Sequence, residues 1–551
     1  MIRSRRGAVV LALACVGLAY ATGIQALGWN QSSHYALIRA LDRGTARIDD
    51  YKYTTGDKAR FHGHWFSSRA PGLAFFSEPA YKAVRVAGLT NRPTVRIAGR
   101  HNNEVVWLLS LFAAALPGLV MVALVWRVGD RLEPGFGFAA AVALGLGTLV
   151  LPFSQLLFSH VFSACLGFAA FALLFRERMQ PSRRRLWPFA LAGLCIGYGV
   201  TTEYPLLFVG IALGVYAITS GEAIRRGAAY AAGVIAGVVP LALYNLWAFG
   251  SVTHVAYADI PRQHAGFFGI RMPSPAVAAE LLLSSRGLLT VAPVLVMGLV
   301  GAVLLYRRGN RAEALLIGAI GLIFIAYNSG YYLPYGGRVP GPRFLITTLP
   351  FLAVPLAVSF RRFPGPTVAL AAVSFVTFGV ATITNPLVSA EGDVGQWTDL
   401  LFGGHLQPTF ISILKVHNEW LAMAPFFVAV PAALVLAVRA TPGLVVRWPS
   451  VVAGVAASGG WALFAVLGPK AFGIDLAAER KIVAAGDSSA TLNVYGTHPL
   501  HDLAEMALAG AVVALLAMRV VTARRSRARA APDLAAAPAP RPREAEAVAA
   551  S

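Results

Sequence analysis

Charged residues are scarce in this sequence, and their scarcity excludes most classes of soluble protein. Only 13% of the 551 residues are Asp, Glu, Lys or Arg, whereas 57% are hydrophobic. A soluble domain carries roughly 25% charged residues. Because charge is low over most of the length, a soluble protein with a single membrane anchor is also excluded. One large helical bundle inside a bilayer is expected instead.

Cysteine is scarce too, and the sequence lacks the usual signatures of metal and nucleotide sites. The three cysteines, Cys15, Cys165 and Cys195, lie inside apolar runs without metal-ligand spacing. Neither a disulfide framework nor a metal centre is therefore expected. There is no glycine-rich loop that would cradle phosphates and no nucleotide-binding fold. An enzyme with this sequence would need no cofactor, and its energised substrate would be neither ATP nor a nucleotide sugar.

Apolar runs long enough to cross a membrane recur along the chain. At about 20 residues per span, they predict an all-α polytopic bundle of about fourteen transmembrane helices. The first run is interpreted as an uncleaved helix, because it is long and no clear signal-peptide cleavage site follows it. The predicted helices lie near 7–27, 104–126, 136–152, 158–175, 187–201, 204–219, 228–248, 287–306, 313–328, 344–360, 365–383, 421–438, 449–467 and 503–521.

The formal net charge of +21 is best explained by membrane topology. Lys and Arg in short loops are retained on the cytoplasmic side, and with fourteen helices every short basic loop falls on that side, together with both termini. We therefore predict a multi-pass protein of the plasma or inner membrane, without a nucleic-acid partner. The short basic loops contain Arg3, Arg5, Arg6, Arg127, Arg131, residues 176–185, Arg225, Arg226, Arg307, Arg308, Arg311, Arg361, Arg362, Arg439, Arg447, Arg519, Arg524, Arg525 and Arg527.

The long irregular segments then fall on the external face. Since long ordered loops often carry function, the active face is expected to be external. Three parts are predicted: a catalytic membrane module (1–383), C-terminal membrane helices with external loops (384–521), and a disordered cytoplasmic tail (522–551). The external segments are 28–103, 249–286, 329–343, 384–420 and 468–502.

The first external loop, 28–103, gathers most of the candidate chemistry. Residues 33–43 have the spacing of an amphipathic surface helix. A dense patch of carboxylates, imidazoles and cations follows, interleaved with aromatic residues that a merely solvated loop would not need. A carboxylate can act as a general base, and Arg or Lys can bind a phosphate leaving group. The patch comprises Asp49, Asp50, Asp57, Lys58, Arg60, His62, His64, Ser67, Ser68 and Arg69.

Three further residues at external helix ends are candidates, each with a structural alternative. His160 opens the helix near 158–175 and is either a ligand contact or part of a helix start. Glu203 lies at a tight turn, where it either binds a substrate or begins a helix. Arg343 lies at the outer mouth of the helix near 344–360. It either meets a lipid phosphate or anchors the helix at the interface.

Two segments resemble the GT-C superfamily of membrane glycosyltransferases, in particular the bacterial dolichyl-phosphate-mannose and aminoarabinose transferase-like proteins. They are GDKARFHGHWFSSRAPGLAFFSEPAY (56–81) and YGGRVPGPRFLITTLPFLAVPLA (335–357). TEYPLL around Glu203 and YNLWAFGS (244–251) support the resemblance, which covers about residues 1–360. It implies transfer of a sugar from a polyprenyl-phosphate donor to a glycan, lipid or protein acceptor of the cell envelope.

The resemblance also implies residue roles. An aspartate of the first loop would deprotonate the acceptor, and a basic residue would hold the departing lipid phosphate. The family often has its acidic residue just after the first helix, where this chain has Asn30-Gln31-Ser32. That departure leaves Asp57, Asp50 or Asp49 as the base, with Asp57 preferred. The residues expected to bind phosphate or substrate are Arg69, Lys58, His64, Arg343, Glu203 and His160.

Two other functions are compatible with the composition. A transporter or flippase of lipid-linked saccharides would be expected to carry charged residues deep within several helices, whereas here they cluster at the external ends. A non-catalytic membrane protein of envelope assembly would tolerate neutralisation of Asp50, Asp57 and Arg69.

Overall fold

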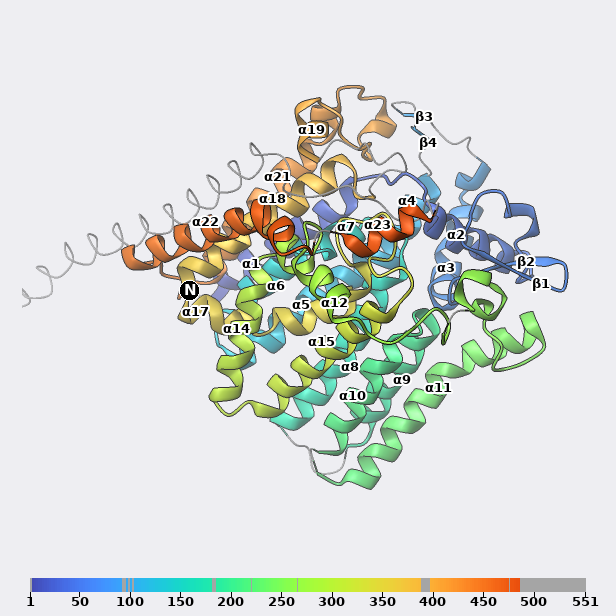
Figure 1. Cartoon of the computed structure of the whole chain (residues 1–551), viewed down its shortest axis with the longest axis horizontal. Coiled ribbons are helices and arrows are strands. Elements are labelled where there is room, and N and C mark those ends of the chain that lie inside the picture. Colours follow the sequence, from blue (N-terminus) through green and yellow to red (C-terminus); the bar gives the residue numbers. More distant parts are fainter. Residues whose placement is uncertain are drawn as a thin grey trace, which may run out of the picture.

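The computed structural model shows an α-helical bundle, which confirms the predicted all-α class (Figure 1). The described residues include strands only in two short antiparallel hairpins, β1 (Lys58–Phe61) with β2 (His64–Ser67) and β3 (Arg96–Ile97) with β4 (Arg100–His101). The structure describes residues 2–91, 96–97, 100–101, 104–180, 185–219, 221–264, 266–387, 397–474 and 476–485.

The chain is a multi-pass membrane protein. Its described residues form seven helices long and apolar enough to cross a membrane, or up to nine if each of two bent pairs is one span. The seven are α1 (Ile2–Thr22), α4 (Glu104–Ser110) continuing into α5 (Leu116–Leu132), α8 (Ser159–Met179), α11 (Ala223–Phe249), α15 (Arg311–Gly330), α18 (Pro364–Thr384) and α22 (Trp448–Ala471).

The two bent pairs contain the spans predicted near 287–306 and 344–360. One joins α12 (Pro275–Leu283) and α13 (Leu288–Val291) to α14 (Val294–Arg307) with a 96° bend. The other joins the 3₁₀ helix η6 (Arg343–Thr348) and α16 (Leu349–Ala353) to α17 (Leu356–Arg362) with a 53° bend.

The remaining helices are shorter. Each predicted span up to 449–467 overlaps a described helix, whereas the one predicted at 503–521 lies outside the described residues, as does the predicted tail. The number fourteen is therefore not established. The shorter helices are α2 (Trp29–Asp42), α3 (Gly72–Val86), α6 (Gly137–Leu146), α7 (Val150–Phe153), α9 (Trp187–Thr202), α10 (Leu206–Ile218), α19 (Trp397–Phe402), α20 (Glu419–Ala422), α21 (Ala424–Ala440) and α23 (Ala477–Ala484).

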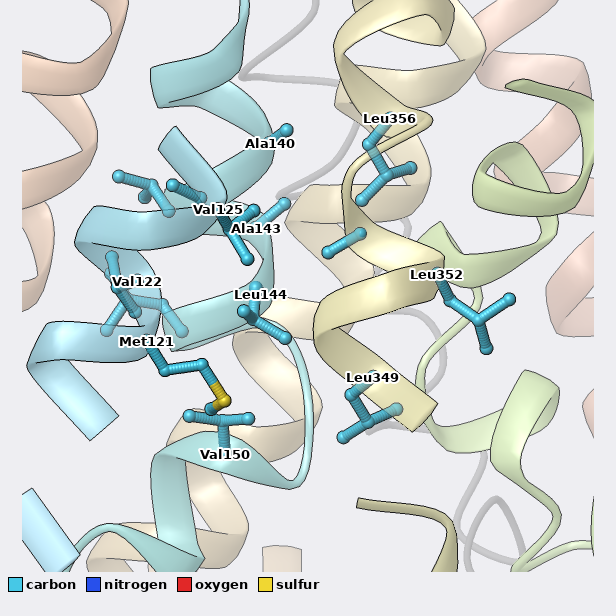
Figure 2. Packing of buried hydrophobic residues seen from close by; sticks show 14 of the residues in the cluster. Met121, Val122, Val125, Ala140, Ala143, Leu144, Val150, Leu349, Leu352 and Leu356 are labelled. Carbon is cyan, nitrogen blue, oxygen red and sulfur yellow. The ribbon is translucent and has the colours of Figure 1, made fainter. Parts of the chain in front are cut away.

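Aliphatic side chains from distant parts of the sequence fill the centre of the bundle (Figure 2). Met121 and Val125 of α5 and Leu144 of α6 are fully buried, as is Leu349 of α16. Lipid supplies no hydrophobic drive between helices, so close packing and small residues hold the bundle together.

Glycines let α9 and α11 approach each other closely. Both helices carry a Gly-x-x-x-Gly pattern, Gly193 with Gly197 and Gly233 with Gly237. A Cβ atom at Gly193 would lie 2.0 Å from the carbonyl oxygen of Tyr230, and one at Gly197 would lie 2.2 Å from that of Val234. This contact fixes the position of α9, and with it the polar turn at the C-terminal end of α9.

Residues of the basic loops meet at one end of the bundle around two carboxylates. Glu133, in the turn between α5 and α6, is 2% exposed and pairs with both Arg308 and Arg361. In the same turn region, Asp130 lies 3.1 Å from a guanidinium nitrogen of Arg5. Loops that are far apart in sequence, but predicted to share one side, therefore contact the same turn.

The first loop forms a compact layer from α2, the β1–β2 hairpin and α3, which lie side by side in Figure 1. The helix predicted at 33–43 is present as α2. Its polar residues 30–34 are buried, however, because the hairpin and α3 cover them. The inward-facing polar residues of α2 bring this layer into contact with the ends of the membrane helices.

Candidate functional site

The open end of the β1–β2 hairpin carries an ion pair between Arg69 and Asp57. The register pairs Lys58 with Ser67, so the residues flanking the two strands lie next to each other. Ser33 of α2 donates a hydrogen bond of 2.6 Å to the carbonyl oxygen of Asp57. Burial of Arg69 opposes its charge, but the Asp57 carboxylate outweighs that effect and raises the pKa of Arg69 above its usual value. Arg69 is therefore a permanent, largely buried cation.

A second polar pair joins the start of α8 to the end of α9. The Nδ1 atom of His160 lies 3.1 Å from Oε1 of Glu203, and the Ser159 hydroxyl donates to the same oxygen. Burial would raise the pKa of Glu203, but His160, Ser159 and Arg69 together outweigh it and lower that pKa to about 2. Glu203 is therefore ionised.

Arg343, the first residue of η6, comes from a third segment of the chain. Its side chain is buried, with the guanidinium carbon 5.3 Å from the ring centre of Phe158 and 5.2 Å from that of Phe344. Its charge interacts with those of Arg69, Asp57 and Glu203. The interfacial snorkelling alternative does not fit this burial, since a snorkelling side chain extends into water.

The turn before Arg343 contains two glycines and accepts hydrogen bonds from Arg286. Gly336 and Gly337 have φ of +78° and +103°, a region that other L-residues rarely adopt. Arg286, which is 2% exposed, donates hydrogen bonds of 3.2 Å and 2.7 Å to the carbonyl oxygens of Gly337 and Val339. These contacts fix the backbone that leads into Arg343.

His34 of α2 completes the group and was missed by the sequence analysis. Its ring is fully buried, and neither ring nitrogen has a hydrogen-bond partner among the described residues. Burial first, and then the charge of Arg69, lower the pKa of His34 from 6.5 to about 3. The signal in the sequence was the polar run of residues 30–34 directly after the first span, which is unusual for a helix in contact with a bilayer.

These residues form one constellation, here called the two-arginine site. Buried polar atoms normally have hydrogen-bond partners, and an unpaired one costs about 1–3 kcal/mol. Several buried atoms of this site have none within the described part of the chain, which suits a polar ligand, and two arginines favour an anionic one. The site comprises His34, Asp57, Arg69, His160, Glu203 and Arg343, and its unpartnered atoms are both ring nitrogens of His34, Nε of Arg69, Nε2 of His160 and Nε of Arg343.

Four predicted site residues make their side-chain contacts elsewhere. Asp49 accepts hydrogen bonds at 2.8 Å from Nδ1 of His64 and at 2.7 Å from the Trp65 N–H. Asp50 is largely exposed and pairs with Arg43 at 2.8 Å. Lys58 contacts the carbonyl oxygen of Lys52 and the Trp65 ring. The side-chain contacts described for Asp49, Asp50, His64 and Lys58 fall within the segment 43–65.

Aromatic rings surround the two-arginine site on its tyrosine-rich side. The rings of Tyr204 and Tyr257 are 5.4 Å apart, and those of Tyr331 and Phe344 are also 5.4 Å apart. Phe344 in turn contacts the His160 ring at 5.6 Å. Among the described residues, no group of three or more His, Cys, Asp or Glu side chains could hold a metal ion.

Comparison with known proteins gives matches only among solved structures. No protein-family model and no curated protein matches the sequence. The chain is similar to ArnT from Cupriavidus metallidurans bound to undecaprenyl phosphate, with 12% identity and a TM-score of 0.45 over 84% of this chain and 80% of that one. It is also similar to the apo oligosaccharyltransferase from Archaeoglobus fulgidus, with 12% identity and a TM-score of 0.39 over 79% of this chain and 56% of that one.

Proposed function

We propose that this protein is a membrane glycosyltransferase that moves a sugar from a polyprenyl-phosphate donor to an acceptor of the cell envelope. The observation that carries the proposal is the convergence of Arg69 and Arg343, both largely buried, at one end of the helical bundle. Guanidinium groups are well suited to phosphate because their fork of N–H donors matches its oxygens. In a low-dielectric site they also stabilise the negative charge that develops on a departing phosphate.

The direction of α8 supports an external location for the site. The helix begins at the site with Ser159 and His160 and ends near Arg178, whose guanidinium lies 3.7 Å from Glu313 in a basic-loop region. At 1.5 Å per residue a helix of this length spans roughly 30 Å, the thickness of the hydrocarbon core. If the basic loops are cytoplasmic, as their charge favours, the two-arginine site opens at the outer leaflet.

The remaining parts of the site fit a lipid-linked sugar. The tyrosine rings offer apolar faces and hydroxyl groups to a sugar, while the arginines bind the phosphate to which it is attached. Of the three aspartates predicted as candidate bases, Asp57 lies directly against Arg69. Asp50 pairs with Arg43, and Asp49 accepts hydrogen bonds from His64 and the Trp65 N–H, so all three carboxylates already have partners.

The phosphate site is tested by binding of undecaprenyl phosphate to the purified protein in lipid nanodiscs. Arg69→Gln and Arg343→Gln are each expected to weaken binding at least 10-fold, since each removes a charge-assisted contact. Arg60→Gln is the matched control, because Arg60 lies on the same hairpin but is exposed. Parental affinity in both Arg69→Gln and Arg343→Gln would contradict the proposal. Inorganic phosphate as competitor distinguishes recognition of the lipid from recognition of phosphate alone.

A further inference from the structure

The His160–Glu203 pair has the geometry of an oriented proton acceptor. A carboxylate only accepts hydrogen bonds, so the 3.1 Å contact between Glu203 Oε1 and His160 Nδ1 requires the proton to reside on Nδ1. The other ring nitrogen, Nε2, then carries a lone pair. This Nε2 atom is buried and has no hydrogen-bond partner among the described residues.

Neighbouring residues hold this arrangement in place. Ser159 donates to Glu203, and both Ser159 and His160 belong to the first turn of α8, while Glu203 follows the last residue of α9. The His160 ring packs against Phe153, Phe158 and Phe344 at centroid distances of 5.9, 5.9 and 5.6 Å. The ring therefore cannot rotate freely, and its Nε2 has a fixed direction.

The charges that face His160 come from several elements. Burial of the ring opposes its protonation most strongly, and Glu203 at the end of α9 favours it. Arg343 of η6 and Arg69 after β2 also oppose it, as does His34 of α2 whenever it is protonated. An anionic donor bound to the arginines would offset their charge. Protonation of His160 would then become easier when substrate is present.

Asp57 is poorly placed to take a proton by comparison. Its carboxylate contacts the guanidinium of Arg69 directly. To take a proton, Asp57 would have to give up this contact, which would leave the Arg69 guanidinium without its carboxylate partner. By contrast, Glu203 stabilises the His160 ring after the ring has gained a proton.

We propose that His160 is the general base of the transfer reaction and that Glu203 is its positioning residue, which makes the acceptor a hydroxyl compound. The inference rests on the proposed function. The acceptor O–H proton passes to Nε2 of His160 while the oxygen forms a bond to the anomeric carbon. The bond from that carbon to the phosphate oxygen breaks, its electron pair stays on the phosphate, and polyprenyl phosphate departs. His160 then releases the proton to water.

The test compares sugar transfer and lipid binding in the same variants. Transfer is measured from undecaprenyl-phosphate sugars, radiolabelled in the sugar, to an envelope extract of the native host. His160→Gln is expected to lower kcat by about 10²–10⁴-fold, yet to bind undecaprenyl phosphate within about 3-fold of the parent. Arg69→Gln weakens lipid binding at least 10-fold, so loss of phosphate binding and loss of the base are distinguishable. His405→Gln, at an exposed histidine, is the control and keeps the parental rate.

Two further measurements distinguish a general-base role of His160 from a purely structural role. In the parent, kcat is expected to fall at low pH with a single ionisation, because a protonated His160 cannot accept a proton. This acidic fall in kcat should disappear in His160→Gln and move to lower pH in Glu203→Gln. Nitrogen NMR of labelled histidine reports the tautomer, with the proton on Nδ1 expected for His160. Parental transfer by His160→Gln, or a proton on Nε2 in the free protein, would overturn the base assignment. No transfer by the parent with any donor would overturn the proposed function and the base assignment with it.

Discussion

At the scale of single residues, the histidine on α2 couples the protonation of the site to the stability of the protein. His34 is fully buried, and its pKa is lowered from 6.5 to about 3. A group whose pKa is depressed in the folded state contributes stability that is present above the unfolded-state pKa and is lost as the pH falls towards the folded one. The ligand-free protein should therefore weaken below pH 6.5.

We predict that His34→Gln reduces this acid sensitivity. Between pH 7.5 and pH 5, the pKa difference of His34 corresponds to about 2 kcal/mol of folding free energy. Thermal unfolding followed by tryptophan fluorescence at both pH values measures the loss. The parent and the exposed-site control His405→Gln should lose more stability on acidification than His34→Gln does. An equal loss in all three proteins would contradict the burial of a neutral imidazole.

The turn before Arg343 gives a second prediction at the residue scale. In Gly336→Ala the new Cβ would lie 2.6 Å from Nε of Arg343, in addition to the strain of a φ of +78°. Gly44→Ala is the matched control, because Gly44 has a φ of +73° and open space around it. Both variants should cost about 1–2 kcal/mol of stability from backbone strain. Only Gly336→Ala should also weaken undecaprenyl phosphate binding, by about 10-fold, and equal affinities would contradict the positioning role of this turn.

The sequence singled out most residues of the two-arginine site as candidates, but not which of them lie together. Arg343, Glu203 and His160 were candidates because they lie at the ends of apolar helices, where charged and polar groups are costly unless they serve a purpose. Arg69 was a candidate because it lies in the polar patch of the first loop and matches the basic position that the resemblance implies. Which of them meet depends on how α8, α9 and the hairpin pack, and no local pattern encodes that packing. Among the three aspartates, the sequence favoured Asp57, and the structure gives each a different partner: Arg69 for Asp57, Arg43 for Asp50, and His64 with the Trp65 N–H for Asp49.

At the scale of secondary structure, hydropathy found the spans but not their shapes. Apolar length is a local property, so helices such as α8 and α18 follow directly from it. The 96° bend before α14 and the 3₁₀ start of the helix that carries Arg343 depend on tertiary contacts, including the Arg286 hydrogen bonds beneath the 336–343 turn. Irregular backbone at membrane depth is tolerated where protein covers it.

The glycine contact between α9 and α11 is the prediction at the element scale. Gly197→Leu would push side-chain atoms into the backbone of α11, where even a Cβ would lie 2.2 Å from the carbonyl oxygen of Val234. We expect the free energy of unfolding to fall by about 1–3 kcal/mol, as overpacked interiors do, and Glu203 to shift with α9. Gly318→Leu on α15 is the control, because its Cβ meets nothing within 4 Å. Equal stability of the two variants would show that the helices do not depend on this close approach.

At the scale of the whole molecule, the bundle keeps two clusters of charged residues apart, one at each end. Basic loops gather around Glu133 and Asp130 at one end, whereas α8 and α9 carry His160 and Glu203 to the other. The sequence predicted this polarity from the distribution of arginine. The sequence could not predict that the arginines are buried. Arg343 is buried against Phe344, its neighbour in the chain, and against Phe158, which comes from a distant segment.

Sugar transfer by the purified protein tests the proposed function most directly. Proteoliposomes receive a panel of undecaprenyl-phosphate hexoses and pentoses, radiolabelled in the sugar, together with an envelope extract of the native host. With at least one donor, we expect label in the acceptor at a rate that falls more than 10²-fold in the Arg69→Gln, Arg343→Gln double variant and is unchanged in Arg60→Gln. Transfer that proceeds equally well without the two buried arginines would contradict a phosphate-binding role for the site.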